Sequence, residues 1–228
     1  MILIDSISFA WQKDQPLFNG FSLSLTEGEI HGIAGLNGAG KTTLLNILAS
    51  YLKPDHGHIS INGNKPSGKQ IAFLETENFF YAYITGREYL QLFKNKHFND
   101  DAWNELFGLP LDELIEHYST GMKKKLAIMA CIRSDKPVMI LDEPFNGLDL
   151  ESSRMLRSLL LKIRASKTIL ITSHILESLT NLCDHIHYIE KGKLVFSQAK
   201  QDFDEIEHKI FRSLEDKHKD LLGRLLDS

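Results

Sequence analysis

The segment "GLNGAGKTT", residues 35–43, decides how the rest of the chain is interpreted. It follows the short apolar run "IHGIA", which predicts a strand. It also opens "KTTLLNILASYL", where leucines recur at helical spacing up to residues 53–54. It fits the pattern G-x-x-x-x-G-K-[ST], whose fixed positions are Gly35, Gly40, Lys41 and Thr42. The pattern therefore stands between a predicted strand and a predicted helix, which is the context it requires.

Phosphate chemistry explains this composition. Backbone N–H groups that turn inward can hold phosphate oxygens, and this curvature is least costly where side chains are absent. The helix that follows points its free N–H groups and the positive end of its dipole at the same anion. Lys41 can reach the β- and γ-phosphates, and the hydroxyl of Thr42 can ligate the accompanying Mg²⁺. A glycine-rich turn that only caps a helix would need neither side chain, so we predict a nucleotide site.

A second motif, "VMILDEP" (Val138–Pro144), selects among nucleotide-binding proteins. Its four apolar residues predict a buried strand that delivers Asp142 and Glu143 to its carboxyl end, where open α/β sheets bind ligands. Asp142 suits Mg²⁺, directly or through water. Glu143 is the natural general base for a water that attacks the γ-phosphorus in line. The alternative, an acidic strand end that caps the next helix, is disfavoured by the phosphate loop upstream.

The remaining pattern predicts a mainly parallel sheet. The first thirty residues alternate apolar and polar, as half-buried strands do, with turn signals at residues 19–20 and 27–28. Further on, buried strands in "KPVMILDEP" and "KTILITSH" flank a helix, which argues for parallel strands covered on both faces. From about residue 85 to residue 135 the apolar spacing is mostly helical, with breaks at residues 108–110 and 119–121. A hairpin that turns at residues 191–192 follows, and the charged tail from Asp202 is predicted to be helical.

Composition limits the classes of protein that this chain can be. Its 228 residues can bury a sizeable core, and a net charge of −4 gives no basic footprint for nucleic acid. No apolar run reaches membrane-spanning length, and the N-terminus "MILIDSISFAW" lacks the pattern of a signal peptide. Cys131 and Cys183 lie in apolar surroundings, which predicts reduced structural thiols. We therefore expect a cytoplasmic protein.

Three further segments resemble the motifs of one family. "YSTGMKKKL", residues 118–126, is similar to the signature written LSGGQ, although Thr120 stands for a glycine and Met122 for the glutamine. "NGLD", residues 146–149, resembles the family's D-loop, and the histidine that ends "ITSH" resembles its switch histidine. With the two motifs above, in this order over residues 2–197, the chain resembles the nucleotide-binding subunit of an ATP-binding-cassette (ABC) transporter.

The resemblance implies a fold and a division into domains. The fold would be an α/β P-loop NTPase core with a mainly parallel sheet, an N-terminal antiparallel β subdomain and an inserted α-helical subdomain. Residues 1–200 would form the ABC ATPase domain, with the helical subdomain inserted at about 78–135. Residues 201–228 would form a charged C-terminal helical tail.

The resemblance also implies that two subunits act together. Ser119 and Gly121 can open a helix whose N-terminus binds an anion, but within one chain this helix lies on the insertion, away from the phosphate loop. In the family two subunits pack head to tail, so that each signature closes over the γ-phosphate held by its partner. Asp149 would help to join the two sites, and His174 would contact the γ-phosphate. We therefore expect a homodimer, or a heterodimer with a second ABC subunit, around two ATP molecules.

Two positions in the nucleotide site stay open. Stacking on adenine needs an aromatic residue upstream of the loop, for which Trp11 is the candidate and Phe9 the alternative, with core packing as the competing role of either. The family's glutamine that helps to hold Mg²⁺ is replaced here by Thr76, and the neighbouring carboxylates of Glu75 and Glu77 could also reach the metal.

The candidate site residues fall into four groups. The general base is Glu143, with His174 beside the phosphate. ATP would be bound by Trp11, Gly35, Leu36, Asn37, Gly38, Ala39, Gly40, Lys41, Thr42 and Thr43. Mg²⁺ would be ligated by Thr42 and Asp142, together with Thr76 or Glu75. The residues expected to act on the partner's nucleotide are Ser119, Thr120 and Gly121, with Asp149 in the D-loop.

Two clusters invite other interpretations. The run "KKK" at residues 123–125 is typical of a nucleic-acid contact, but lysines early in a helix more often face solvent, so no nucleic-acid partner is expected. His185 and His187 alternate along a predicted strand and could suggest a metal. No cysteine or carboxylate stands at ligand spacing from them, so we predict a solvated strand face.

The expected function is that of a transporter's ATPase. The chain would bind Mg·ATP, dimerise, hydrolyse ATP and drive a separate integral membrane permease, with export as the expected direction, at the inner face of the cell membrane. Residues 84–90, after the aromatics Phe79, Phe80, Tyr81 and Tyr83, lie where the family docks a permease helix, with core packing as the alternative for some of them. The other hypotheses are a soluble ABC ATPase outside transport and a nucleotide-gated regulatory subunit.

Overall fold

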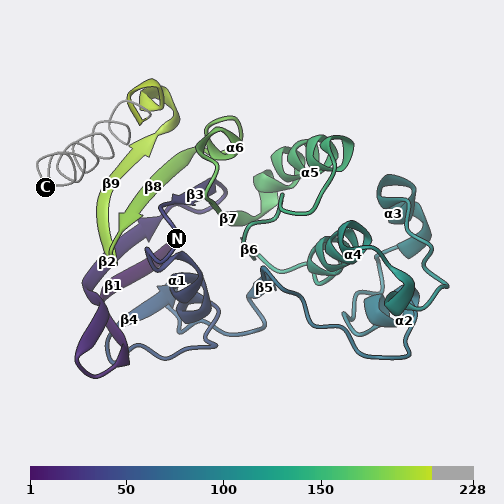
Figure 1. The fold of residues 1–228 in the computed structure, drawn as a ribbon, viewed down its shortest axis with the longest axis horizontal. Coiled ribbons are helices and arrows are strands. Elements are labelled where there is room, and N and C mark those ends of the chain that lie inside the picture. Colours follow the sequence, from purple (N-terminus) through teal and green to yellow (C-terminus); the bar gives the residue numbers. More distant parts are fainter. Residues whose placement is uncertain (207–228) are drawn as a thin grey trace, which may run out of the picture.

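The fold has two β-sheets with helices around them, in a computed structural model that describes residues 1–206 (Figure 1). The smaller sheet is antiparallel and contains, in the order β2-β1-β4, the strands β1 (Ile2–Gln12), β2 (Gln15–Leu25) and β4 (His56–Ile61). The larger sheet has the order β5-β6-β7-β3-β8-β9. Its strands are β3 (Ile30–Ala34), β5 (Ile71–Leu74), β6 (Val138–Leu141), β7 (Thr168–Ser173), β8 (His185–Glu190) and β9 (Lys193–Ala199). Only the last pair, β8 with β9, is antiparallel in this sheet. The predicted α/β fold with a mainly parallel sheet and an N-terminal antiparallel sheet is confirmed.

Helices occupy both the faces of the larger sheet and a lobe to one side of it. The α-helices are α1 (Lys41–Leu48), α2 (Gly86–Gln91), α3 (Asp100–Phe107), α4 (Thr120–Arg133), α5 (Leu150–Ile163) and α6 (Leu176–Thr180). A 3₁₀ turn, η1 (Ile115–His117), precedes α4. All of α2, α3 and α4 lie between β5 and β6 in the sequence, and Figure 1 shows α2 and α3 on the side of the molecule away from the antiparallel sheet. Among residues 1–206 we find no helix with the length and apolar character needed to cross a membrane.

The core consists of two apolar layers, one on each face of the larger sheet. On β6 the side chains alternate between them, as a period of two requires. Val138 and Ile140 join α1 and the antiparallel sheet in one cluster. Met139 and Leu141 join α4, α5 and α6 in the other. The central strands are therefore buried on both faces, which explains their unbroken apolar sequence.

Parallel pairing brings the candidate residues to one edge of the sheet. The strands β3, β7 and β6 are neighbours and run in the same direction. Their carboxyl ends carry, in turn, the glycine-rich loop, His174, and the pair Asp142 and Glu143. Tertiary structure thus assembles in space three motifs that are far apart in the sequence.

Several predicted boundaries were wrong for local reasons. Residues 19–20 lie inside β2 and not in a turn, because register shifts along the β1–β2 pair absorb Gly20, whose φ is 70°. The chain reverses instead at residues 13–14. The first helix ends at Leu48 and not near residue 53, since Ser50 adopts a φ of 65° that a helix cannot continue through.

Other boundaries were predicted correctly. Gly108, at φ 61°, ends α3, and Ser119 caps α4 with its hydroxyl, which accepts from the N–H of Met122. The hairpin between β8 and β9 turns at residues 191–192. Of the predicted helical tail, Ile206 is described and buried, whereas residues 207–228 lie outside the described part of the chain.

Candidate active site

The glycine-rich loop is packed too closely for side chains at two of its glycines. A β-carbon on Gly35 would lie 2.3 Å from the carbonyl oxygen of Ile189. Gly40, which caps α1, has a φ of 105°, and a β-carbon there would lie 3.0 Å from the ring of Phe18. The loop is thus held between β8 and β2, at the carboxyl end of β3 and directly before the N-terminus of α1.

Lys41 is largely buried and folds back over this loop. Its Nζ donates to the carbonyl oxygen of Gly35 at 2.7 Å and to that of Leu36 at 3.3 Å. Burial lowers the pKa of Lys41, whereas the nearby carboxylates of Glu143 and Asp142 raise it. The ammonium therefore stays beside the loop, within the field of both acidic side chains.

Asp142 lies at the centre of a buried network of hydroxyl groups. Its carboxylate is 1% exposed. The hydroxyls of Thr42 and Thr76 each donate to Oδ2 at 2.8 Å, and the hydroxyl of Thr172 donates to Oδ1. Three elements, α1, the segment after β5, and β7, therefore converge on one carboxylate.

Glu143 is oriented by both its backbone and its side chain. Its N–H donates to the hydroxyl of Thr172 at 2.9 Å, and its φ of 48° is rare for a residue other than glycine. Its Oε1 lies 3.0 Å from Nδ1 of His174, which follows β7. A strained backbone at an acidic residue is typical of functional sites, because the surrounding contacts must hold it in place.

One cavity of about 540 Å³ joins most of the predicted site residues. Its lining comprises Trp11, Leu17, Asn37, Gly38, Gly40, Lys41, Thr42, Thr43, Thr76, Asp142, Glu143, Asn146 and His174. Trp11 is 65% exposed at this cavity, whereas Phe9 is buried and meets Trp11 edge to face at a ring distance of 5.2 Å. Of the two aromatic candidates, only Trp11 presents a free ring to the cavity.

The oxygen ligands around Asp142 suit Mg²⁺. This ion prefers carboxylate, hydroxyl, phosphate and water oxygens, and it usually keeps only one or two protein carboxylates. Asp142 with the hydroxyls of Thr42 and Thr76 forms such a set beside the loop. Of the candidates, Thr76 contacts Asp142 directly through its hydroxyl, and Glu77 lines a neighbouring pocket. The choice between Thr76 and Glu75 as a metal ligand stays a prediction.

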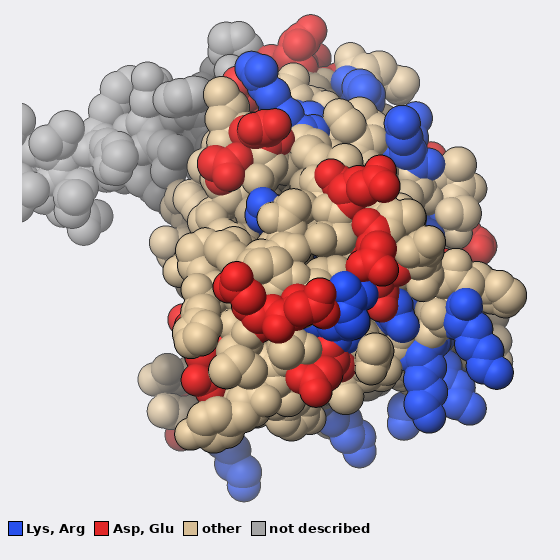
Figure 2. Space-filling view, turned by 90° about the vertical axis from the view of Figure 1, so that its right-hand side faces the viewer, with Lys and Arg blue, Asp and Glu red and all other residues tan. Residues whose placement is uncertain are grey.

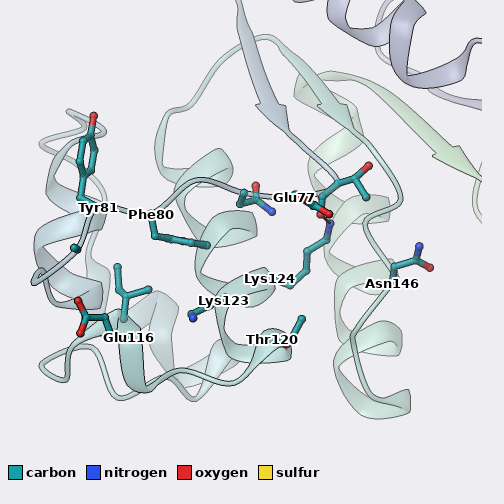
Figure 3. A pocket seen from close by; sticks show the side chains of 12 residues that line it. Glu77, Phe80, Tyr81, Glu116, Thr120, Lys123, Lys124 and Asn146 are labelled. Carbon is teal, nitrogen blue, oxygen red and sulfur yellow. Dashed lines mark hydrogen bonds between the residues drawn. The ribbon is translucent and has the colours of Figure 1, made fainter.

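The signature segment and Asp149 of the D-loop stand apart from this cavity, although Asn146 at the start of the D-loop lines it. Thr120 opens α4 and lines a second pocket of about 470 Å³, shown in Figure 3, which it shares with Phe80, Tyr81 and Glu116. Asp149 caps α5, where its carboxylate accepts from the N–H of Ser152 at 2.7 Å. The hydrogen bonds from the N–H and the hydroxyl of Ser152 lower the pKa of Asp149. Within one chain the structure does not bring these residues to the glycine-rich loop.

Two predictions about charged clusters were wrong. In the run at residues 123–125, the middle lysine, Lys124, does not face solvent, because α4 packs that side against the ends of β5 and β6. The strand face with His187 is not solvated either, since its ring stacks on that of His31 from β3 at 5.4 Å, and both are almost fully buried. Among residues 1–206 there is no cluster of three or more histidine, cysteine, aspartate or glutamate residues placed to hold a metal ion, and both cysteines are free and buried.

Two contributors to the site could not be found from sequence. Thr172 lies inside an apolar strand with no motif of its own, and Asn146 belongs to the segment that resembles the D-loop, where only Asp149 was assigned a role. Only the pairing of β6 with β7 shows that Thr172 bridges Asp142 and Glu143.

Comparisons with known proteins agree with this geometry. The family model described as ABC transporter matches residues 18–146. The chain is 34% identical to the ABC transporter ATP-binding protein NatA of Bacillus subtilis over 82% of its own length and 83% of that protein. It is 28% identical to the thiamine import ATP-binding protein ThiQ of Vibrio parahaemolyticus, covering 85% and 89% of the two chains. The solved structure of an ATP-binding subunit of an ABC transporter superposes with a TM-score of 0.78 and 25% identity, over 92% of this chain and 93% of that one. The chain therefore belongs to the ABC transporter family, in which it is an ATP-binding protein of the ATPase type.

Proposed function

We propose that this chain is the motor subunit of an ABC transporter, which hydrolyses Mg·ATP with Glu143 as general base and drives a separate membrane permease. The observation that carries the catalytic part is the placement of Glu143, paired with His174, across one cavity from Lys41 and Thr42. A carboxylate and a phosphate-binding loop that face the same cavity are what in-line hydrolysis needs.

Glu143 has the position of a general base. Its carboxylate would accept a proton from a water molecule as the water oxygen attacks the γ-phosphorus. The bond from that phosphorus to the bridging oxygen would break, and ADP would leave with the electron pair. His174 holds the carboxylate through Nδ1, and its Nε2 would face the γ-phosphate. Lys41 would exchange the carbonyls of Gly35 and Leu36 for phosphate oxygens.

Substrate placement follows from the same lining. Mg²⁺, when bound, would neutralise charge that develops on the β- and γ-phosphate oxygens. Asp142, Thr42 and Thr76 would hold it, directly or through water, with the Thr42 hydroxyl turned from Asp142 to the metal. The exposed ring of Trp11 would stack on adenine.

A second subunit would complete the site. Ser119, Thr120 and Gly121 lie at the N-terminus of α4, whose free N–H groups favour an anion, yet they stand outside the cavity of their own chain. A head-to-tail homodimer, or a heterodimer with another ABC subunit, would bring this helix end to the γ-phosphate of the partner, with Asp149 near the junction.

The helical segment between β5 and β6, residues 78–135, would couple this chemistry to the permease. The pocket of Figure 3 connects Thr76 at the nucleotide site with Phe80 and Tyr81, and Tyr81 is exposed. Figure 2 shows acidic side chains on this face. The exposed acids of the segment are Glu88, Asp101, Glu105, Asp112, Glu113, Glu116 and Asp135, of which Asp101 and Asp112 are paired with Arg87. A short permease helix with aromatic and basic side chains would fit such a surface.

The chain would work at the inner face of the cell membrane, and we propose export as the direction. The resemblance drawn from the motifs and the compact helical insertion support export. ThiQ, at 28% identity, is named as an import protein. Transport of cargo into the cell would therefore overturn the proposal of export. Uptake and efflux measured in vesicles with the reconstituted permease would separate the two.

Glu143→Gln tests the catalytic proposal. Glutamine keeps the shape of the side chain but cannot accept the proton, so we expect ATP turnover to fall by more than about a hundredfold. Binding of ATP should be retained, and ATP-dependent dimers should accumulate and be measurable by gel filtration. The matched control is Glu105→Gln on α3, which should leave turnover unchanged.

The same variant separates the other hypotheses. A nucleotide-gated regulatory subunit would keep its biological activity with Glu143→Gln, whereas a transporter motor would lose transport. Affinity purification from detergent-solubilised membranes would identify a permease that accompanies the chain in stoichiometric amount. Recovery with no membrane partner would contradict the transport proposal and leave an ABC ATPase with a role outside transport.

A further inference from the structure

A buried lysine links the helical segment to the nucleotide site. Lys124 lies in the second turn of α4 and is 5% exposed. Its Nζ lies 3.4 Å from the carbonyl oxygen of Glu75, 3.5 Å from that of Thr76 and 3.5 Å from that of Asp142. Figure 3 shows the side chain running from α4 toward the segment that carries Glu77. The ammonium therefore contacts the main chain of two segments at once.

These carbonyls mark the point where two strands separate. The ladder between β5 and β6 closes with the N–H of Asp142, which donates to Leu74 at 2.9 Å. Glu75 and Thr76 come directly after β5, and the chain after Asp142 leads away to α5. Beyond the last ladder bond the two segments are joined by the Thr76 hydroxyl, which donates to Asp142, and by the ammonium of Lys124.

A lysine is costly to keep in such a place. Burial of an ammonium group is unfavourable unless polar partners compensate for its lost hydration. Here the hydrogen bonds run to main-chain carbonyls, so they fix the positions of Thr76 and Asp142. Burial lowers the pKa of Lys124, whereas the nearby carboxylates of Asp142 and Glu143 raise it.

The same helix carries the signature residues. Ser119 caps α4, and Lys124 lies five positions further on, about 7.5 Å along the helix axis. A helix is rigid over this length, so displacement of its N-terminus displaces the ammonium as well.

We propose that Lys124 is a positioning residue, which fixes Thr76 and Asp142 against α4 so that their oxygens are placed for Mg²⁺ only while α4 is packed on the strand ends. This inference rests on the proposed function of Mg·ATP hydrolysis. This chain has Thr76 where the family has a glutamine. Lys124 would connect the signature helix directly to the metal ligands.

Lys124 should affect only one of two parts of ATP binding, the gain in affinity that Mg²⁺ gives, and not the binding of phosphates by the loop. Lys41 and the glycine-rich loop hold phosphates without any contact with Lys124, so loss of the ammonium should leave Mg²⁺-independent binding intact. The Mg²⁺-dependent gain in affinity should fall, because residues that orient metal ligands typically affect metal affinity by about 10- to 100-fold.

The test compares Lys124→Met, which keeps length but has no donor, with Lys124→Gln, which keeps N–H donors without the charge. Lys162→Met, at an exposed position near the end of α5, is the matched control. Binding of a fluorescent ATP analogue is measured by anisotropy in excess EDTA and again with Mg²⁺. For Lys124→Met we expect unchanged affinity in EDTA and about tenfold or greater loss of the gain that Mg²⁺ gives. Lys124→Gln should recover part of that gain, and turnover should follow the same order through kcat.

Hydrogen exchange keeps the test valid if Lys124→Met folds poorly. In the folded Lys124→Gln protein, amides at residues 75–78 should exchange faster than in the wild type, whereas the Lys162→Met protein should match the wild type. Folded variants with wild-type Mg²⁺ dependence and wild-type exchange at residues 75–78 would overturn the role of Lys124. A wild type that neither binds Mg·ATP nor hydrolyses it would instead overturn the proposed function, so the two failures are distinguishable.

Discussion

At the scale of single residues, the glycine-rich loop depends on positions where a side chain does not fit or where φ is positive. Gly35 has no room for a side chain because the carbonyl oxygen of Ile189 approaches it closely. Gly38, three positions on, has open space around it and needs glycine only for its φ of 79°. The two glycines of one loop are therefore required for different physical reasons.

Alanine substitution separates these reasons. Gly38→Ala introduces only backbone strain, so we expect a loss of about 1 kcal/mol in the free energy of unfolding. Gly35→Ala adds a clash with the backbone of β8, which must move, so the loss should be at least about twice as large and ATP binding should weaken. Urea unfolding measures the first effect, and titration with ATP measures the second. Equal losses for the two variants would contradict the packing that the structure shows.

At the scale of elements, buried histidines connect three strands of the larger sheet. His31 on β3 donates from Nε2 to the carbonyl oxygen of Thr26 at 2.9 Å, so its Nδ1 accepts from Nε2 of His187 on β8 at 3.2 Å. Nδ1 of His187 then accepts from the hydroxyl of Ser197 on β9. This chain of hydrogen bonds is complete when both rings are neutral. The partly exposed ring of His185 stacks on that of His31, and its Nε2 lies 3.1 Å from Oε2 of Glu29.

The stability of the protein should therefore depend on pH through this stack. Burial lowers the pKa of His187 to about 3, helped by His31 and His185. Burial also lowers the pKa of His31. The Thr26 carbonyl, Glu29 and Asp184 raise this pKa, and His185 lowers it further. Below about pH 6.5 the unfolded chain binds protons that the native rings do not, so stability is present above that pH and is lost as the pH falls. Each ring contributes up to about 1.4 kcal/mol per pH unit.

Urea unfolding at several values between pH 5 and pH 7.5 checks this expectation. His187→Asn removes one titrating ring, so the slope of the free energy of unfolding against pH should become shallower by up to about 1.4 kcal/mol per unit. His58→Asn, on the exposed face of β4, is the control and should leave the slope unchanged. Identical slopes in the wild type and the His187→Asn protein would show that the buried stack does not set the pH dependence.

At the scale of the whole molecule, three of the exposed aromatic residues, Phe79, Tyr81 and Tyr83, lie together in the segment that leads into α2. Tyr81 is exposed and meets Phe79 edge to face at a ring distance of 5.1 Å, beside the pocket that reaches Thr76. Phe80 instead packs on Tyr89, so core packing accounts for one of the predicted interface aromatics. A partner that binds this surface would touch the segment that leads directly into the nucleotide site.

Tyr81→Ala tests the docking surface independently of catalysis. A central aromatic contact in an interface typically contributes about 2 kcal/mol, or roughly a 30-fold change in affinity. We expect the variant to co-purify with the permease in much smaller amount, while ATP turnover of the isolated subunit stays the same. Tyr51→Ala, which removes an exposed aromatic residue on another surface after α1, should bind the permease normally. Loss of binding in both variants, or in neither, would argue against this surface.

The sequence by itself determined the phosphate loop, the acidic strand end and the order of the family motifs. These features are local, since glycine spacing, apolar runs and helix caps act over a few residues. That is why the α/β fold, the cap at Ser119 and the break at Gly108 were predicted correctly. The positions of Asp142 and Glu143 at a strand end also followed from the apolar run before them.

Only the tertiary structure decided which side chains are buried and which of them meet. Lys124 belongs to a basic run, and His187 to an alternating strand, so their sequence patterns indicate solvent exposure. Both are buried because helices and strands from distant parts of the chain pack over them. Thr172 joins Asp142 to Glu143 only through the pairing of β6 with β7. Burial is a sum of long-range contacts, and no short stretch of sequence contains that sum.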